Sequence, residues 1–352
     1  MTHPKTKALI ATLGLALGSG HALAQVLPGE TGELVQPEPM GGGEKGVTPS
    51  QPPAPPVVPA EQRVPRDMQL RGEALQLVRA AARSDRPSFR AQAIEALQLG
   101  AGRDADATIL RGLRDEEPIV RFAAAMAVGA LDLRSAYPDP LLRLANPRED
   151  AQVRVGAIYA TTVLGDTRLT DELAALTRHT SETVRGSAVL ALGLTDAPSA
   201  IEVLNGRRGD PSPAVRLQTY EALWRLGDVE ARDSLISGMF SLYPDEELFC
   251  TLALAANGDR RVIVHIRPKL TSEYSYIALA ASRAMGQLGS DEGYGVALQG
   301  AKSEDPQDRS LAAFAFGDIG RLDAQPYLGQ LMTDADPNVR LAAASAVLKL
   351  TQ

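Results

Sequence analysis

Small and apolar residues recur along most of this sequence with a period of about 31 residues. Each unit has a polar turn, an apolar residue followed by Arg, a run of small residues, and finally Leu and Gly. The steps between the first five of these arginines are 31, 33, 31 and 31, and further steps of 31 from Arg216 reach Glu247, Ala278, Arg309 and Arg340. The period therefore continues through two units that lack the arginine, and about nine units are visible.

Each unit predicts a pair of helices. In one of them Val184, Ala188 and Leu192 lie at helical spacing and form a single apolar stripe. Acidic residues and prolines in the turns, as in Asp336-Pro337, favour the start of the second helix. The first helices are expected between each Gly and the next turn, at 169–178, 200–207, 230–240 and 327–334. One pair cannot bury both of its faces, so neighbouring units must stack. The sequence thus predicts an all-α fold at residues 67–352, a right-handed α-solenoid that forms an elongated, curved superhelix.

The best preserved unit also resembles a known family. The sequence Asp-Pro-Asn-Val-Arg-Leu-Ala-Ala-Ala-Ser-Ala-Val-Leu at 336–348 is similar to the short HEAT repeats of the phycobilisome-lyase-like family. The resemblance covers about residues 67–352. Proteins built from such repeats include bilin lyases, di-iron deoxyhypusine hydroxylases, DNA-alkylation repair proteins and plain scaffolds, so the resemblance implies the fold more strongly than any activity.

The N-terminal region differs from the repeats. Residues 1–24 combine Lys5 and Lys7, an apolar run, and the small residues Ala22-Leu23-Ala24, which is typical of a signal peptide cleaved after Ala24. The apolar run is too short to span a membrane, so no integral membrane span is expected and the location should be periplasmic or secreted. Residues 25–66 are rich in Pro and Gly and predict a disordered or polyproline-like tail. This tail is either a spacer or a recognition motif.

Composition excludes several functions. Loss of residues 1–24 removes two lysines and no acids, which changes the formal charge from −7 to −9 and disfavours nucleic acid as a partner. None of the four histidines precedes a Glu, as the di-iron hydroxylases would require, and no ligand set for zinc is evident. Cys250 is a single cysteine at a small-residue position, expected to be buried and inert. No cofactor, metal or catalytic residue is predicted.

The arginine column is expected to be structural. In the resembled family this arginine is a ladder residue that bonds turn acids or carbonyls, and acidic residues such as Asp115 and Asp210 lie four to six positions upstream as available partners. The alternative is a row of cations that binds an anion, which the net charge disfavours. The ladder residues are Arg90, Arg121, Arg154, Arg185, Arg216, Arg309 and Arg340.

Apolar residues also occupy positions one and five places after the arginine, where the second helix is expected to face the concave side. They either form an exposed apolar groove for a partner, or are buried against adjacent repeats by tight curvature. These positions hold Phe122, Met126, Val155, Tyr159, Leu190, Leu217, Leu248, Leu252, Leu279, Phe314 and Leu341.

The two ends of the repeat array are expected to differ. Residues 67–83 predict a charged amphipathic helix that caps the first unit, whereas the chain stops two residues after Leu350, which would leave the last unit open for self-association. The predicted function is a non-catalytic scaffold, exported to the periplasm, that binds a protein partner through its concave surface. The alternatives are a groove that binds a small hydrophobic ligand or pigment, and an enzyme with a dispersed site.

Overall fold

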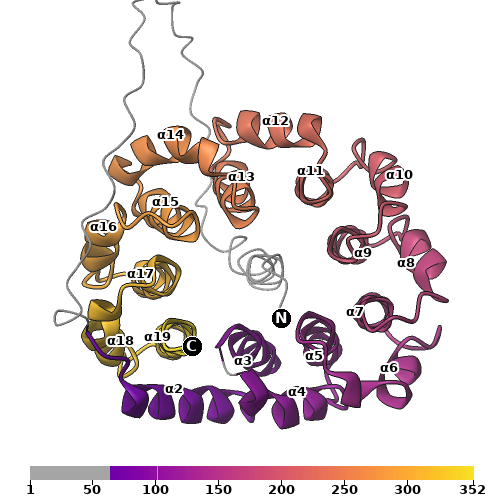
Figure 1. Ribbon diagram of the computed structural model, residues 1–352, viewed down its shortest axis with the longest axis horizontal. Helices are drawn as coiled ribbons and strands as arrows, with labels where there is room; N and C mark the ends of the chain where they lie inside the picture. The colour runs from indigo at the N-terminus through magenta and orange to yellow at the C-terminus, as the bar shows by residue number, and fades with distance from the viewer. Residues whose placement is uncertain (1–63, 101) are drawn as a thin grey trace, which may run out of the picture.

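The computed structural model describes residues 64–100 and 102–352, and all the regular elements in this part of the chain are helices. The predicted signal peptide and nearly all of the predicted tail lie outside the described residues. The helices alternate between an outer and an inner layer (Figure 1), which gives nine pairs over 64–352. This arrangement confirms the predicted solenoid of helix pairs.

The inner layer holds the second helix of each pair. Its members are α3 (Pro87–Gly100), α5 (Pro118–Ala130), α7 (Ala151–Val163), α9 (Glu182–Leu194), α11 (Pro213–Arg225), α13 (Pro244–Ala256), α15 (Ser275–Gln287), α17 (Pro306–Ile319) and α19 (Pro337–Leu350). The outer layer holds the first helices: α2 (Met68–Ala81), α4 (Asp106–Gly112), α6 (Asp139–Leu144), α8 (Thr170–Leu176), α10 (Ala200–Asn205), α12 (Val229–Gly238), α14 (Ile263–Ile266), α16 (Tyr294–Gly300) and α18 (Gln325–Leu331). Short 3₁₀ turns adjoin several of these outer helices.

The starts of the inner helices follow the residues of the preceding turns. The Asp305 carboxylate accepts a hydrogen bond from the backbone N–H of Gln307, and Asp336 accepts from those of Asn338 and Val339. A proline follows each of these aspartates in the first turn, where it needs no hydrogen-bond partner for its nitrogen. The sequence therefore fixes the helix starts locally.

The periodic glycines serve two purposes. Gly165, Gly227, Gly258, Gly289 and Gly320 have positive φ and terminate helices, as expected for C-terminal caps. Others lie inside helices at the seams between inner helices. A Cβ on Gly286 would lie 2.5 Å from the backbone nitrogen of Ile319, and one on Gly193 would lie 2.6 Å from the Cβ of Ala222. These seam glycines let adjacent inner helices approach backbone to backbone.

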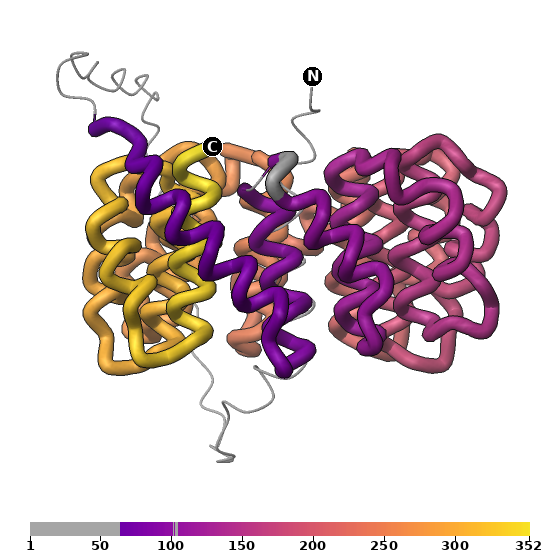
Figure 2. Tube along the Cα trace, turned by 90° about the horizontal axis from the view of Figure 1, so that it is seen from below, coloured from indigo at the N-terminus to yellow at the C-terminus, as the bar shows by residue number. Residues whose placement is uncertain are grey.

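The two ends of the array meet, so the solenoid closes into a ring (Figures 1 and 2). Helix α19 packs against both α2 and α3. Arg71 on α2 donates from Nη1 to the carbonyl of Leu348 (2.9 Å) and to Thr351 Oγ1 (3.1 Å), and from Nη2 to the carbonyl of Gly100 (2.8 Å). One arginine thus ties the first unit to the last.

Ring closure corrects two expectations about the ends. The predicted elongated superhelix with an open last unit is wrong, because α2 and α3 cover that unit. The helix at 67–83 likewise does not cap a free end: one face of it packs in the closing seam and the other is exposed. The physical reason is accumulated curvature: nine units that each turn by about 40° complete a circle, which places the apolar faces of the two ends against each other.

Candidate functional site

The apolar positions after the arginine are mostly buried. Nine of the eleven have almost no exposed surface, and Leu217 and Phe314 are half-buried. The Phe122 ring lies 3.1 Å from where a Cβ on Gly156 would stand, and the Tyr159 ring lies 2.5 Å from the equivalent point on Gly129. Glycines in neighbouring helices accept these side chains, as Gly300 accepts Leu279. The expectation of an exposed apolar groove along these positions is therefore wrong. These residues are instead buried against adjacent repeats.

The arginine ladder has one repeated geometry. In six of its seven members Nη1 donates to the backbone carbonyl six residues earlier. Arg90, Arg185 and Arg309 also form a two-point bond with an aspartate 25 residues later, in the turn of the next unit, at 2.7 to 3.0 Å. The acid partner therefore lies downstream, not four to six residues upstream as expected; the upstream residue contributes its carbonyl.

Each ladder aspartate joins two consecutive units. The Asp210 carboxylate accepts hydrogen bonds from Arg185, and the Asp210 backbone carbonyl accepts one from Arg216. Asp115 and Asp334 accept hydrogen bonds from their two neighbouring ladder arginines in the same way. Burial alone would raise the pKa of Asp210, but the hydrogen bonds from Arg185 and from the backbone N–H of Ser212 outweigh it and lower that pKa. These guanidinium groups are thus occupied by protein acceptors rather than displayed to an anion.

The ladder changes in the two units that lack the arginine. Glu247 occupies the arginine position of α13, and its carboxylate accepts a hydrogen bond from Lys269 of the next turn, which reverses the order of charges. Lys269 Nζ also donates to the carbonyl of Met239 (2.7 Å) and lies 5.4 Å from the centre of the Phe240 ring. In the following unit Ala278 leaves the position without a charged group.

Exposed apolar side chains gather on these same two units. Leu242 is 90 % exposed, Tyr243 74 %, Phe240 61 % and Tyr274 59 %. The Phe240 ring makes an edge contact with His265 on α14 at 5.8 Å, and the Tyr274 ring lies 6.0 Å from that of Tyr276. We call Phe240, Leu242, Tyr243 and Tyr274 the rim patch, since they lie on the turns at which α13 and α15 begin (Figure 1).

The two tyrosines of the rim patch are equivalent residues of consecutive repeats. Tyr243 and Tyr274 are 31 residues apart, and each is the N-cap of its inner helix with no side-chain cap hydrogen bond. Each backbone N–H donates to a serine hydroxyl two residues earlier at 3.2 Å, Ser241 and Ser272 respectively. Four inner helices have Asp or Ser side chains that do form the cap hydrogen bond. A tyrosine at this position lacks the stabilisation of about 1 kcal/mol that a side-chain cap gives a helix.

Acidic groups surround the rim patch. Asp245, Glu246 and Glu247 occupy the first turn of α13, and Glu273 is exposed beside Tyr274. Burial raises the pKa of Tyr276, and the charges of Tyr274, Glu247 and Asp245 add to the increase. The patch is therefore an aromatic surface bordered mainly by acidic groups, with Lys269 beside Phe240.

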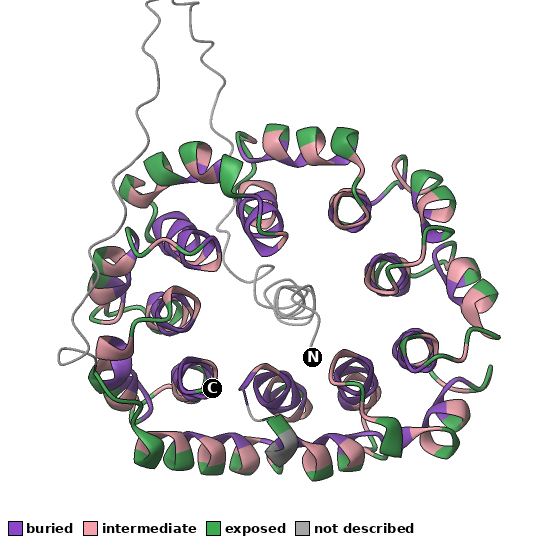
Figure 3. Ribbon diagram, viewed as in Figure 1, coloured by how far each residue is buried: buried purple, intermediate pink, exposed green. Residues whose placement is uncertain are grey.

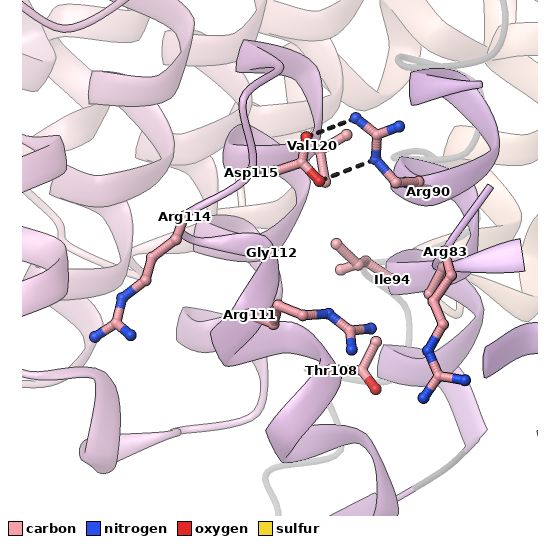
Figure 4. A pocket seen from close by; sticks show the side chains of 10 residues that line it. Arg83, Arg90, Ile94, Thr108, Arg111, Gly112, Arg114, Asp115 and Val120 are labelled. Carbon is pink, nitrogen blue, oxygen red and sulfur yellow. Dashed lines mark hydrogen bonds and ion pairs between the residues drawn. The ribbon is translucent and has the colours of Figure 1, made fainter. Parts of the chain in front are cut away.

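A second surface feature is a cavity of about 400 Å³ between the first two units (Figure 4). Arg90 lies on its wall but is held by Asp115. Arg83 and Arg111 extend near Thr108, whereas Arg114 points away. Arg83, Arg111 and Arg114 are exposed and do not converge on one point, whereas a small-molecule site is typically an apolar pocket with a few converging polar groups.

The remaining candidates have structural surroundings. Cys250 is buried in α13, and burial raises the pKa of its thiol to about 12, with smaller contributions from Glu246 and Glu221. His179 Nδ1 accepts from the backbone N–H of Ser181. Within 64–100 and 102–352 no cluster of three potential metal ligands occurs. None of the helices in these ranges has the length and apolar character to cross a bilayer.

The repeat pattern did not predict the rim patch, because the residues of the patch depart from that pattern. Two signals were available: Glu247 in the arginine position, and Tyr243 and Tyr274 at the position where most other turns carry Asp, Ser or Glu. Exposure of apolar residues depends on how units stack, so only the structure separates these exposed residues from the buried ones (Figure 3).

Comparison with known proteins agrees with this architecture. HEAT repeats match residues 74–162, 138–210, 169–241 and 295–352, which together span more than half of the sequence. The chain therefore belongs to the HEAT-repeat family. No curated protein matches its sequence.

Several solved structures are similar at low sequence identity. Human deoxyhypusine hydroxylase in complex with glycerol has a TM-score of 0.37 at 18 % identity, covering 71 % of this chain and 97 % of that one. The CpcE and CpcF complex of phycocyanin lyase from Nostoc sp. PCC7120 has 0.31 at 19 %, covering 69 % and 94 %. Karyopherin Kap121p bound to the extreme C-terminus of the protein phosphatase Cdc14p has 0.35 at 14 %, covering 77 % and 37 %. None of these similarities transfers an activity to this chain.

Proposed function

We propose that this chain is an exported, non-catalytic scaffold that binds a protein partner through the rim patch. The observation that carries the proposal is the exposure of Phe240, Leu242, Tyr243 and Tyr274 on adjacent turns. Contiguous exposed apolar groups mark interaction sites, and aromatic residues are enriched at the centres of interfaces. The two tyrosines occupy the position at which Asp or Ser caps four other inner helices, so their side chains are available for contact with a partner.

The location of the proposed contact differs from the concave surface expected from the sequence. The concave apolar positions are filled by packing between repeats, so they offer little surface to a partner or to a small hydrophobic ligand. Export to the periplasm is supported by the composition of residues 1–24. Its test is fractionation of cells that express the full chain, with sequencing of the mature N-terminus, which should begin at Gln25.

The docking proposal is tested by capture from the cell envelope with tagged full chains. We expect a partner recovered by the unmodified chain to be reduced at least tenfold by Leu242→Ser with Tyr243→Ser. Val229→Ser is the matched control, because Val229 is 62 % exposed on α12 and lies outside the patch. Equal recovery with both variants would contradict docking at the rim.

A further inference from the structure

The spacing of the two rim tyrosines suits a particular ligand conformation. Tyr243 and Tyr274 are N-caps in identical serine-closed turns of neighbouring repeats, so their separation is that of adjacent packed helices, about 8–10 Å. A polyproline II helix has three residues per turn and rises about 9 Å per turn. Every third residue of such a segment would therefore meet one tyrosine after the other.

The chemistry of the patch fits the same ligand. Aromatic-lined grooves bind proline-rich segments, because proline rings stack on aromatic faces and a polyproline II backbone is already extended. The carbonyls of such a segment are free to accept hydrogen bonds. The exposed hydroxyls of Tyr243 and Tyr274 can donate to them.

This chain contains a segment of the required kind. Residues 52–59 read Pro-Pro-Ala-Pro-Pro-Val-Val-Pro, with five prolines in eight residues and no charge. An uncharged segment meets no repulsion from the acidic border formed by Asp245, Glu246 and Glu273. We propose that the rim patch binds a polyproline II segment and that its occupant is residues 52–59 of a second copy of this chain. This inference rests on the proposed function, since it assigns a ligand to the same patch.

A second copy is proposed because the full segment 52–59 cannot lie on the patch of its own ring. The folded part begins beside α18, where Gln325 donates to the carbonyl of Pro65 (2.9 Å) and accepts from the backbone N–H of Asp67 (2.6 Å). Helix α2 starts at the edge of the ring where α19 ends, whereas the inner helices start at the opposite edge (Figure 2). Crossing that height takes about 20 Å, the length of a 13-residue helix such as α15. The five steps from Pro59 to Val64 span at most about 18 Å, before any sideways distance.

The test uses a labelled peptide of residues 50–61 and fluorescence anisotropy. The receptor is the full chain with Pro52, Pro53, Pro55 and Pro56 replaced by Ala, so that its own tail does not compete. We expect saturable binding that weakens at least tenfold when Tyr243→Ser and Tyr274→Ser are added. The same two changes should leave the melting temperature unchanged or higher, because serine restores the N-caps, as Ser212 does on α11. Loss of binding then does not reflect unfolding.

The control receptor carries Val229→Ser and should bind normally, and a peptide with its prolines replaced by alanine should not bind. Sedimentation of the otherwise unmodified full chain should show a mass that rises with concentration, and the rise should disappear in the proline-substituted chain. Binding that ignores the tyrosine changes, peptide that fails to bind, or a chain that stays monomeric would each overturn the inference. Failure here with continued loss of the envelope partner in the rim variant would leave the proposed function standing.

Discussion

At the residue scale, the ladder arginines form ion pairs and hydrogen bonds that connect consecutive repeats. Arg185 and Asp210 form two hydrogen bonds at 2.8 and 2.9 Å, and the Asp210 side chain is only 1 % exposed. A buried, two-point ion pair of this kind is costly to break from one side, because the remaining charge has no partner. The arginine column therefore contributes to stacking rather than to ligand binding.

Replacing Arg185 by Ala should lower the free energy of unfolding by roughly 3–5 kcal/mol. The folded-state pKa of Asp210 is lowered, so the pair stabilises the chain above the ordinary pKa of Asp, and this contribution disappears as pH falls through the folded value. The deficit of the variant, measured by urea unfolding, should thus shrink below about pH 4. Arg134→Ala is the control, since Arg134 and Asp132 form an exposed pair; such a pair contributes at most about 1 kcal/mol. Equal effects for the two variants would refute the ladder's structural role.

A second residue has the opposite pH behaviour. Glu95 on α3 is buried, its Oε1 has no hydrogen-bond partner, and burial raises its pKa to about 8. The folded state therefore holds this proton more tightly than the unfolded state, so stability is fullest below the unfolded pKa of about 4.3 and declines as pH rises toward 8. Glu95→Gln should remove that decline. The difference in free energy of unfolding between the variant and the native chain should then grow by roughly 1 kcal/mol per pH unit in this range. Melting curves from pH 5 to 8 measure it, with exposed Glu273→Gln as control; parallel curves would argue against the raised pKa.

At the element scale, the seam glycines set the distance between inner helices. Gly286 on α15 lies against the backbone of Asp318 and Ile319 on α17, so a methyl group there cannot be accommodated by rotating a side chain. The charged groups beside this seam, Arg283, Asp318 and Lys349, are bonded across α15, α17 and α19 and would move with the helices.

Gly286→Ala should therefore destabilise the chain by about 1–3 kcal/mol, despite the better helix propensity of alanine. Gly295 on α16 has no atom within 4 Å of its would-be Cβ, so Gly295→Ala should stabilise by roughly 0.5–1 kcal/mol. Chemical unfolding of the two variants gives effects of opposite sign if the seam assignment holds. A stabilising Gly286→Ala would show that the inner helices are not in close contact there.

At the scale of the whole molecule, closure depends on contacts between the two ends of the chain. Besides the bonds of Arg71, a Cβ on Gly100 would lie 2.4 Å from the carbonyl carbon of Leu348, so α3 and α19 touch through their backbones. The main apolar core accordingly includes Ala74 and Val78 together with Leu348 and Leu350. The first and last units share one core.

Arg71→Ala should loosen this seam, because three hydrogen bonds to α3, α19 and the C-terminus are lost together. We expect a larger radius of gyration by small-angle X-ray scattering and faster amide exchange in α19, with α9 and α11 unaffected. Arg83→Ala, an exposed arginine just beyond α2, should change neither. An unchanged scattering curve together with unchanged exchange in α19 would show that Arg71 does not maintain closure.

The sequence by itself determined the repeat, the helix pairs and their starts, because capping, proline placement and the apolar stripe of each helix act within one unit. The expected first helices appear as α8, α10, α12 and α18, each shorter than predicted, and the arginine column contacts the turns as expected, although with a different acid. Contacts between distant residues were decided only by the tertiary structure. Whether the ends meet, whether Phe122 or Tyr243 is exposed, and which aspartate meets which arginine all depend on the small rotation from one unit to the next. That rotation is set by the packing of neighbouring units at the seams, so it cannot be inferred from the sequence of one unit alone.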